Sequence, residues 1–211
     1  MLSHYFTVKE TGEHEIVIER SRFLAHFARA TTEAEAIEFI QRIKKMHHSA
    51  NHNCSAYLIG EQDHIQKAND DGEPSGTAGV PMLEVLKKRK LKDVVVVVTR
   101  YFGGIKLGAG GLIRAYGKSV SEGLNAIGVV ERKLMQIVHT KIDYTLLGKV
   151  ENDIRSSPYI IKEINYLEKV EILTYVAVKD LQNFKEYLIN LTNAHATIED
   201  GSLEYLEEKI L

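Results

Sequence analysis

The chain has 211 residues, of which 44% are hydrophobic and 27% are charged, and its formal net charge is −2. This composition is ordinary for a soluble globular protein with one large or two small domains. No stretch approaches about 18 apolar residues, and the N-terminus lacks a basic region followed by an apolar core, so we expect neither a transmembrane helix nor a signal peptide. The single cysteine, Cys54, excludes an internal disulfide, which favours a reducing, cytoplasmic location.

Positive charge is concentrated in the middle of the chain. Residues 80–135 contain 11 basic and 4 acidic residues, a net charge of +7, whereas the segments before and after them are acidic. Such a concentration in an acidic protein favours a local anionic partner. The alternative is that this segment faces the acidic segments across the fold.

The first fifty residues predict strands followed by a helix. Short, partly alternating runs rich in β-formers predict strands at 4–8 and over 14–29. Thr32 and Glu35 have the spacing of a capping box and open a helix that ends near residue 47. The buried face of this helix is predicted to contain Ile37, Ile40 and Ile43.

The next segment predicts a strand, a loop and a second helix. Residues 54–59 read as a strand, with 64–68 as its hairpin partner. Residues 70–79 are rich in turn formers and predict a loop. Pro81 is expected at the first position of a helix that ends in the basic run 87–92. This run is typical of a solvated helix end, and contact with RNA phosphate is the alternative.

Five consecutive valines, at positions 94–98, begin the most informative stretch. A continuous run of β-branched residues predicts a strand that is buried on both faces. Five glycines follow within nine residues, and after the last of them we expect a helix that ends at Gly128. The buried face of this helix is predicted to contain Leu112, Tyr116, Val120, Leu124 and Ile127.

The order of buried strand, glycine-rich loop and helix predicts an anion site. Such a loop presents free backbone N–H groups and the positive end of a helix to phosphate or to an RNA backbone. The predicted ligand-binding residues are Arg100, Tyr101, Gly103, Gly104, Lys106, Gly108, Gly110, Gly111, Arg114 and Lys118. The alternative is that the glycines only allow tight packing of strand and helix. Their spacing matches neither a Walker site nor a dinucleotide fingerprint.

Tyr101 and Phe102, beside this loop, could stack RNA bases. We expect Phe102 to be part of the core and leave the role of Tyr101 open.

Three carboxylates, those of Asp70, Asp71 and Glu73, precede the second helix. They could hold Mg²⁺ or act as general acid and base, which would make a composite site with the glycine loop. The favoured interpretation is that the aspartates build a turn and that Glu73 forms a salt bridge with the basic segment. No other cofactor is predicted.

Four potential metal ligands lie within eight residues: His47, His48, His52 and Cys54. Their spacing matches no standard zinc pattern, so metal binding stays open and is not the favoured interpretation. Cys54 is more typical of a small buried hydrophobic residue.

The chain changes character near residue 134, which predicts one domain over 1–134 and a second over 135–211. The second reads as strand 135–144, helix 146–156, strands 160–166 and 170–178, helix 181–192 and a strand within 196–206. This β-α-β-β-α-β order is the ferredoxin-like motif, and the predicted fold class is α+β.

Two blocks, DDGEPSGTAGVP at 70–81 and VVTRYFGGIKLGAGGLIRAYG at 97–117, resemble the IMPACT family in its bacterial YigZ-type branch, and the residues around 53–57 support the resemblance. It implies an N-terminal domain with the fold of elongation factor G domain IV, including a left-handed β-α-β crossover. It also implies a C-terminal domain like domains III and V of that factor. Eukaryotic members are translational regulators that bind ribosomes.

We therefore expect a cytoplasmic RNA- or ribosome-associated protein that modulates translation through the basic glycine-rich face, without a membrane partner. The alternative is an enzyme or ligand-binding protein that acts on a phosphorylated small molecule with Mg²⁺, through the loops at 70–73 and 103–111. A protein–protein module is a third possibility. The sequence leaves open the ligand, the existence of a reaction and the oligomeric state.

Overall fold

A computed structural model describes residues 1–210, which divide into two compact units. The first unit contains residues 2–132 and 208–210, and the second contains residues 133–207 with Met1. Within the described residues, no helix combines the length and apolarity that crossing a membrane requires.

The first unit is built on a five-stranded antiparallel sheet with the order β2-β3-β6-β4-β5. The strands are β2 (Gly12–Ile18), β3 (Ser21–Arg29), β6 (Val94–Tyr101), β4 (His52–Ile59) and β5 (Ile65–Asn69). All five valines of β6 are fully buried, which confirms the strand buried on both faces that the sequence predicts. Because β3 and β4 both pair antiparallel with β6, they run parallel to each other, and the chain between them forms a β-α-β crossover.

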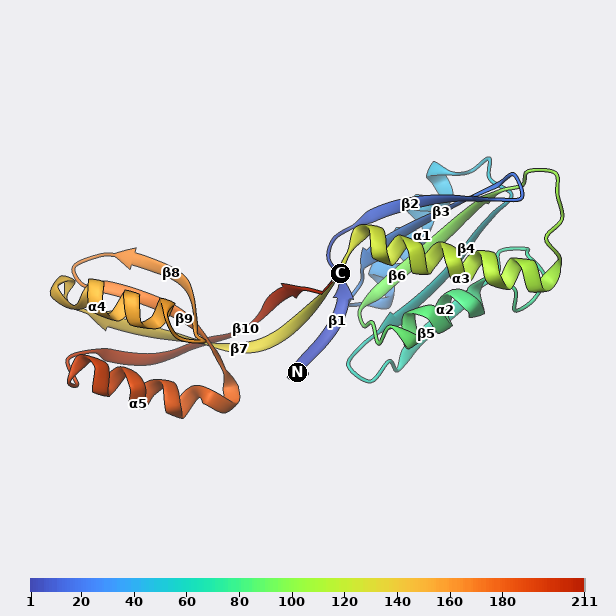
Figure 1. Ribbon diagram of the computed structural model, residues 1–211. Helices are drawn as coiled ribbons and strands as arrows, with labels where there is room; N and C mark the ends of the chain where they lie inside the picture. The colour runs from blue at the N-terminus through green and yellow to red at the C-terminus, as the bar shows by residue number, and fades with distance from the viewer. Residues whose placement is uncertain (211) are drawn as a thin grey trace. The chain divides into compact units, whose positions relative to one another are not determined.

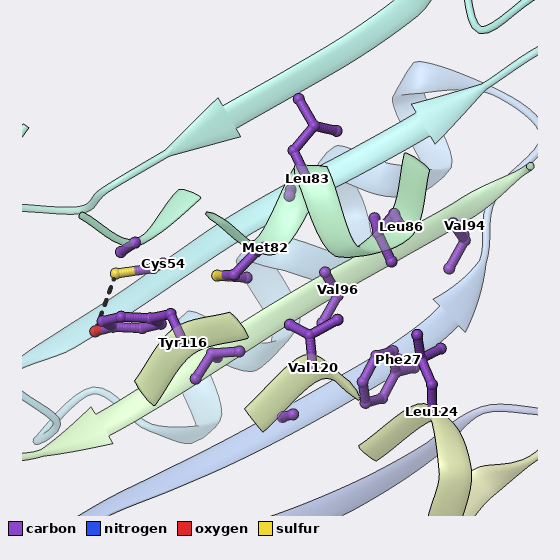
Figure 2. Close-up of a cluster of buried hydrophobic side chains, with 14 of the residues drawn as sticks. Phe27, Cys54, Met82, Leu83, Leu86, Val94, Val96, Tyr116, Val120 and Leu124 are labelled. Atoms are coloured by element: carbon purple, nitrogen blue, oxygen red, sulfur yellow. Dashed lines mark hydrogen bonds between the residues drawn. The ribbon is translucent and has the colours of Figure 1, made fainter. Parts of the chain in front are cut away.

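Helices cover both faces of this sheet (Figure 1). On one face, α1 (Glu33–Met46) packs against Val95 and Val97. On the other face lie α2 (Gly79–Lys88) and α3 (Gly108–Ile127). Figure 2 shows side chains of α2 and α3 converging on Phe27 and Val96 of the sheet. The first strand, β1 (His4–Val8), joins this unit through a hydrogen bond of 2.8 Å from Lys92 N to Phe6 O.

The start of α1 is as predicted, and its buried face is so in part, because Ile43 is buried and Ile40 packs against the core. Thr32 accepts a hydrogen bond from Glu35 N, and the Glu35 carboxylate accepts one from Thr32 N, so the capping box is confirmed. The predicted burial of Ile37 is wrong, because this side chain is 40% exposed. The buried residues are Ala36, Phe39 and Ile43, since the bulky Phe39 ring turns its own side of the helix toward the sheet.

The starts of α2 and α3 also differ from the prediction. Pro81 is the third residue of α2, not the first, because Asp70 Oδ1 accepts hydrogen bonds from Ala78 N and Gly79 N and lets the helix begin earlier. Helix α3 begins at Gly108, so its first turn contains three of the five glycines that were assigned to the loop.

The second unit has the ferredoxin-like order of elements. These are β7 (Val129–Ile142), α4 (Tyr144–Arg155), β8 (Ile160–Tyr166), β9 (Val170–Ala177), a short 3-10 helix η1 (Val178–Asp180), α5 (Leu181–Thr192) and β10 (Thr197–Lys209). The first residues of β7 and the last residues of β10 belong to the first unit. Among these strands, β7, β9 and β8 are neighbours in that order and β10 pairs with β7, which together with the helices confirms the predicted α+β class. Strand β7 begins at Val129, earlier than the predicted residue 135, because its β-branched start continues directly from Gly128.

Candidate functional site

Two adjoining clefts lie at the N-terminal end of α3, in the first unit. The larger, called here the basic cleft, has a volume of about 520 Å³ and is lined by Ile18, Glu19, Ile105, Lys106, Leu107, Gly111, Arg114, Ala115 and Lys118. The small cleft has a volume of about 300 Å³ and is lined by Glu73, Pro74, Arg100, Phe102, Lys106, Leu107, Gly108, Ala109 and Leu112. Lys106 and Leu107 line both clefts, so the two are neighbours.

The cations of the basic cleft are largely available to a ligand. Lys106 and Arg114 are exposed, and within residues 1–210 neither has a carboxylate at ion-pair distance. Lys118 Nζ lies 3.7 Å from Glu122 Oε1 in an exposed pair, and such a pair contributes little stability. Glu19 is the one acidic residue in the lining, so the cleft carries a net positive charge.

The first turn of α3 adds unpaired backbone donors to these cations. Its N-cap residue, Leu107, provides no side-chain hydrogen bond, and the first turn contains no acidic residue. The initial N–H groups of a helix lack intrahelical partners and carry the positive end of its dipole. This helix end is therefore chemically suited to an anion.

The glycines of this stretch serve two different purposes. A Cβ at Gly103 would lie 2.1 Å from the backbone of Arg20, so this glycine is needed for close packing against the β2–β3 turn. Gly108 has a φ of +66°, and no neighbouring atom lies within 4 Å of the position that a Cβ would take. The same is true of the Cβ position at Gly104. The packing interpretation therefore holds for Gly103, whereas the backbone at Gly104 and Gly108 is open to a ligand.

Arg100 is placed differently from the other predicted cations. It is only 5% exposed, and its Nη1 donates a hydrogen bond of 2.7 Å to Glu73 Oε1. Its guanidinium also lies over the rings of Phe23 and Phe102, at 5.3 and 5.5 Å. The prediction of Arg100 as an open phosphate contact therefore does not fit its position, because its charge is neutralised by the salt bridge that was the favoured interpretation for Glu73.

The two aspartates are engaged inside the protein. Asp70 Oδ1 and Oδ2 accept hydrogen bonds from the backbone N–H groups of Ala78, Gly79 and Gly76. Partial burial opposes the charged form, but these three amide hydrogen bonds outweigh it and hold the pKa of Asp70 below its usual value. Asp71 accepts hydrogen bonds from Lys44 Nζ at 2.5 Å and from Asn53 N at 2.7 Å.

The donor groups of this region do not assemble as a metal site. Within residues 1–210, no three His, Cys, Asp or Glu side chains are close enough to hold a metal ion. In the histidine cluster, His47 Nδ1 bonds the Tyr101 hydroxyl, His52 Nδ1 bonds the Asp71 carbonyl, and His48 is exposed. Cys54 is fully buried beside Tyr116, and burial raises the pKa of its thiol to about 12. It thus behaves as the small buried residue that the sequence predicts.

Of the two aromatic residues beside the glycine-rich loop, Phe102 and Tyr101, the first lies where the sequence did not predict it. Phe102 is 44% exposed, so its prediction as a core residue is wrong. Strand β6 ends at Tyr101, and the following residue leaves the sheet and turns toward the small cleft. Tyr101 is half-buried and bonds His47, so it is tied to the α1 side of the sheet.

Ile18 and Glu19 belong to the basic cleft but were not predicted to do so. They precede α3 by nearly ninety residues, and no local pattern connects them with the glycine stretch.

These features define a class of protein: a two-domain α+β protein whose N-terminal domain carries a basic surface at a helix N-terminus. The Impact N-terminal domain matches residues 19–124, and a domain of unknown function, DUF1949, matches residues 140–195. The chain belongs to the IMPACT family.

Relatives cover the chain to different extents. The IMPACT family member YvyE of Bacillus subtilis (strain 168) is 70% identical over 210 residues, which span 100% of this chain and 97% of that protein. An IMPACT family member of Haemophilus influenzae is 32% identical and covers 94% of this chain and 97% of its own length. Protein IMPACT of Homo sapiens is 36% identical over 103 residues, which span 46% of this chain and 32% of that protein. A solved structure described as a hypothetical protein has a TM-score of 0.61 at 26% identity, covering 94% of this chain and 97% of that chain.

Proposed function

We propose that this protein is a cytoplasmic RNA-binding protein that associates with the ribosome and modulates translation. The observation that carries the proposal is the basic cleft, in which Lys106 and Arg114 stand without acidic partners among the described residues, beside the uncapped N-terminus of α3. Phosphate groups would lie between these side chains and the amides of the first helical turn.

The charge distribution supports this assignment. The protein as a whole is slightly acidic, yet the segment 80–135, which contributes most of both clefts, carries a net charge of +7. A protein with a negative total charge needs such a local concentration to attract a polyanion. The alternative that the segment is neutralised across the fold applies to Arg100 but not to Lys106 or Arg114.

The exposed ring of Phe102 supports single-stranded RNA as the preferred form. A base that is not held in a duplex can stack on an aromatic side chain, and each such contact contributes about 1–3 kcal/mol. Phe102 lines the small cleft next to Lys106, so a base and its phosphate would find adjoining positions.

Family membership supports a role in translation. Eukaryotic members of the IMPACT family are translational regulators, and relatedness to them covers 46% of this chain. The alternative, a Mg²⁺-dependent enzyme, is less well supported. The carboxylates of Asp70 and Asp71 already accept hydrogen bonds from backbone amides and from Lys44.

The proposal is tested by fluorescence anisotropy with a labelled eight-nucleotide oligouridine, U8, at several salt concentrations, together with cosedimentation with ribosomes. We expect saturable binding at low salt and an affinity that falls steeply as salt rises, since released counterions drive phosphate contacts. Absence of binding to both U8 and ribosomes at low salt would overturn the proposal.

A further inference from the structure

We propose that the small cleft holds one unstacked base of the bound RNA and that Glu73 selects guanine there. This inference rests on the proposed function and adds a base preference to it. Its basis is the unequal use of the two oxygens of a buried carboxylate at the wall of the cleft.

One oxygen of Glu73 is fully occupied. Its Oε1 accepts hydrogen bonds from Arg100 Nη1 at 2.7 Å and from the Tyr116 hydroxyl at 2.8 Å, which use both lone pairs. These two contacts fix the orientation of the carboxylate, and its side chain is only 3% exposed.

The other oxygen is left for a ligand. Within residues 1–210, Glu73 Oε2 has no hydrogen-bond partner, and His52 Nε2 lies 3.8 Å from it. His52 Nδ1 is already bonded to the Asp71 carbonyl, at 2.9 Å. A carboxylate oxygen in a nearly buried position is costly without a donor, so an N–H group that enters the cleft would gain a charge-assisted hydrogen bond.

The walls of the cleft suit a flat aromatic ring. Pro74, Leu107 and Leu112 contribute apolar surface, and the exposed ring of Phe102 offers a stacking face. A volume of about 300 Å³ accommodates a purine base. Lys106 lines this cleft and the basic cleft, so the phosphate next to the bound base can lie in the basic cleft.

The free oxygen distinguishes among the four bases by their edges. Guanine presents two adjacent donors, N1–H and the N2 amino group, which can both donate to the two lone pairs of Oε2, and its O6 can accept from Lys106. Uracil presents a single N–H between two carbonyl oxygens, which a carboxylate repels. Adenine and cytosine present an amino group beside a ring nitrogen that carries a lone pair, so each offers one donor and one repulsive contact.

The test compares U8 with the same oligonucleotide carrying one central guanine, adenine or cytosine, by anisotropy at constant salt. We expect the guanine oligonucleotide to bind at least about fivefold more tightly than U8, with adenine and cytosine in between. Glu73→Gln keeps the shape of the side chain but not its charge, and should abolish most of the ratio between the guanine and U8 affinities, whatever its effect on the U8 affinity itself. Glu84→Gln, an exposed carboxylate change on α2, is the matched control and should keep it.

Equal affinity for the guanine and uracil oligonucleotides would overturn the inference, as would an unchanged preference in a folded Glu73→Gln protein. If Glu73→Gln does not fold, NMR titration of the unmodified protein with guanosine and uridine monophosphates replaces it, and equal shifts at Gly104 and Gly108 count against the inference. Failure of U8 to bind would count against the proposed function. Binding of U8 without a guanine preference would count against this inference alone.

Discussion

Arg100 Nη1 and Glu73 Oε1 form a hydrogen-bonded ion pair of 2.7 Å, and the two side chains are 6% and 3% exposed. The pair joins the central strand β6 to the loop before α2, and Tyr116 of α3 bonds the same carboxylate oxygen. It thereby links three elements that surround the small cleft, and its first consequence is for stability.

Replacing Arg100 by Met should strongly destabilise the first unit. Removing one partner of a buried pair leaves the other charge unpaired, which costs about 3–5 kcal/mol. Urea unfolding followed by circular dichroism measures the change. Lys87→Met, which breaks the exposed pair with Glu84, is the control and should cost less than about 1 kcal/mol. Similar losses in the two variants would contradict a structural role for the buried pair.

The double variant Lys106→Gln, Arg114→Gln should weaken RNA binding without unfolding the protein, because both side chains are exposed. The slope of log affinity against log salt should fall in magnitude by about 1.4, since each single-strand phosphate contact contributes about 0.7. Lys45→Gln, Lys67→Gln removes the same charge from exposed positions outside both clefts and serves as the control. If both double variants lower the slope equally, the cleft has no special role.

Phe102→Ala should lower RNA affinity by about 1–3 kcal/mol, the usual contribution of one stacked base. Because Phe102 is 44% exposed, its replacement should change the unfolding free energy much less than a core substitution. Anisotropy and urea unfolding separate the two effects. Tyr166→Ala, an exposed aromatic change in the second unit, should leave the affinity unchanged. An undiminished affinity in Phe102→Ala would argue against stacking.

The thiol of Cys54 should resist alkylation in the folded protein. Burial raises its pKa to about 12, and the side chain is fully enclosed, so the reactive thiolate is almost absent at neutral pH. Mass spectrometry after iodoacetamide treatment should show slow modification in buffer and fast modification in guanidinium chloride. Fast labelling of the folded protein would show that the pocket of Cys54 opens readily.

His26 should make stability fall in mild acid. Burial and the neighbouring ring of His47 lower the pKa of His26, although Glu13 Oε2 lies 3.2 Å away and opposes the shift. The unfolded chain, with a pKa near 6.5, then binds more protons than the folded protein, so the unfolding free energy decreases as pH falls below about 6.5.

Urea unfolding at pH 7.5 and pH 5.5 measures this effect. The loss of stability between the two pH values should be smaller in His26→Gln than in the unmodified protein, whereas the exposed His48→Gln should behave like the unmodified protein. An identical loss in His26→Gln would assign the acid sensitivity to other groups.

The sequence by itself determined the elements whose cause lies in neighbouring residues. The five valines from Val94 specify a strand buried on both faces, because β-branched side chains without polar alternation suit that environment. Thr32 and Glu35 specify the start of α1, because each side chain accepts a hydrogen bond from the backbone N–H of the other within one helical turn. The order of strands and helices after residue 134 likewise specifies the ferredoxin-like unit.

Only the tertiary structure decided which distant residues form ion pairs and which side chains are exposed. Arg100 could have been a free cation, but strand pairing and the loop before α2 place Glu73, 27 residues away, against its guanidinium. Phe102 could have closed the core, but β6 ends one residue before it and turns it outward. Ion pairs and exposure depend on which segments the sheet brings together, and local sequence patterns carry no information about that choice.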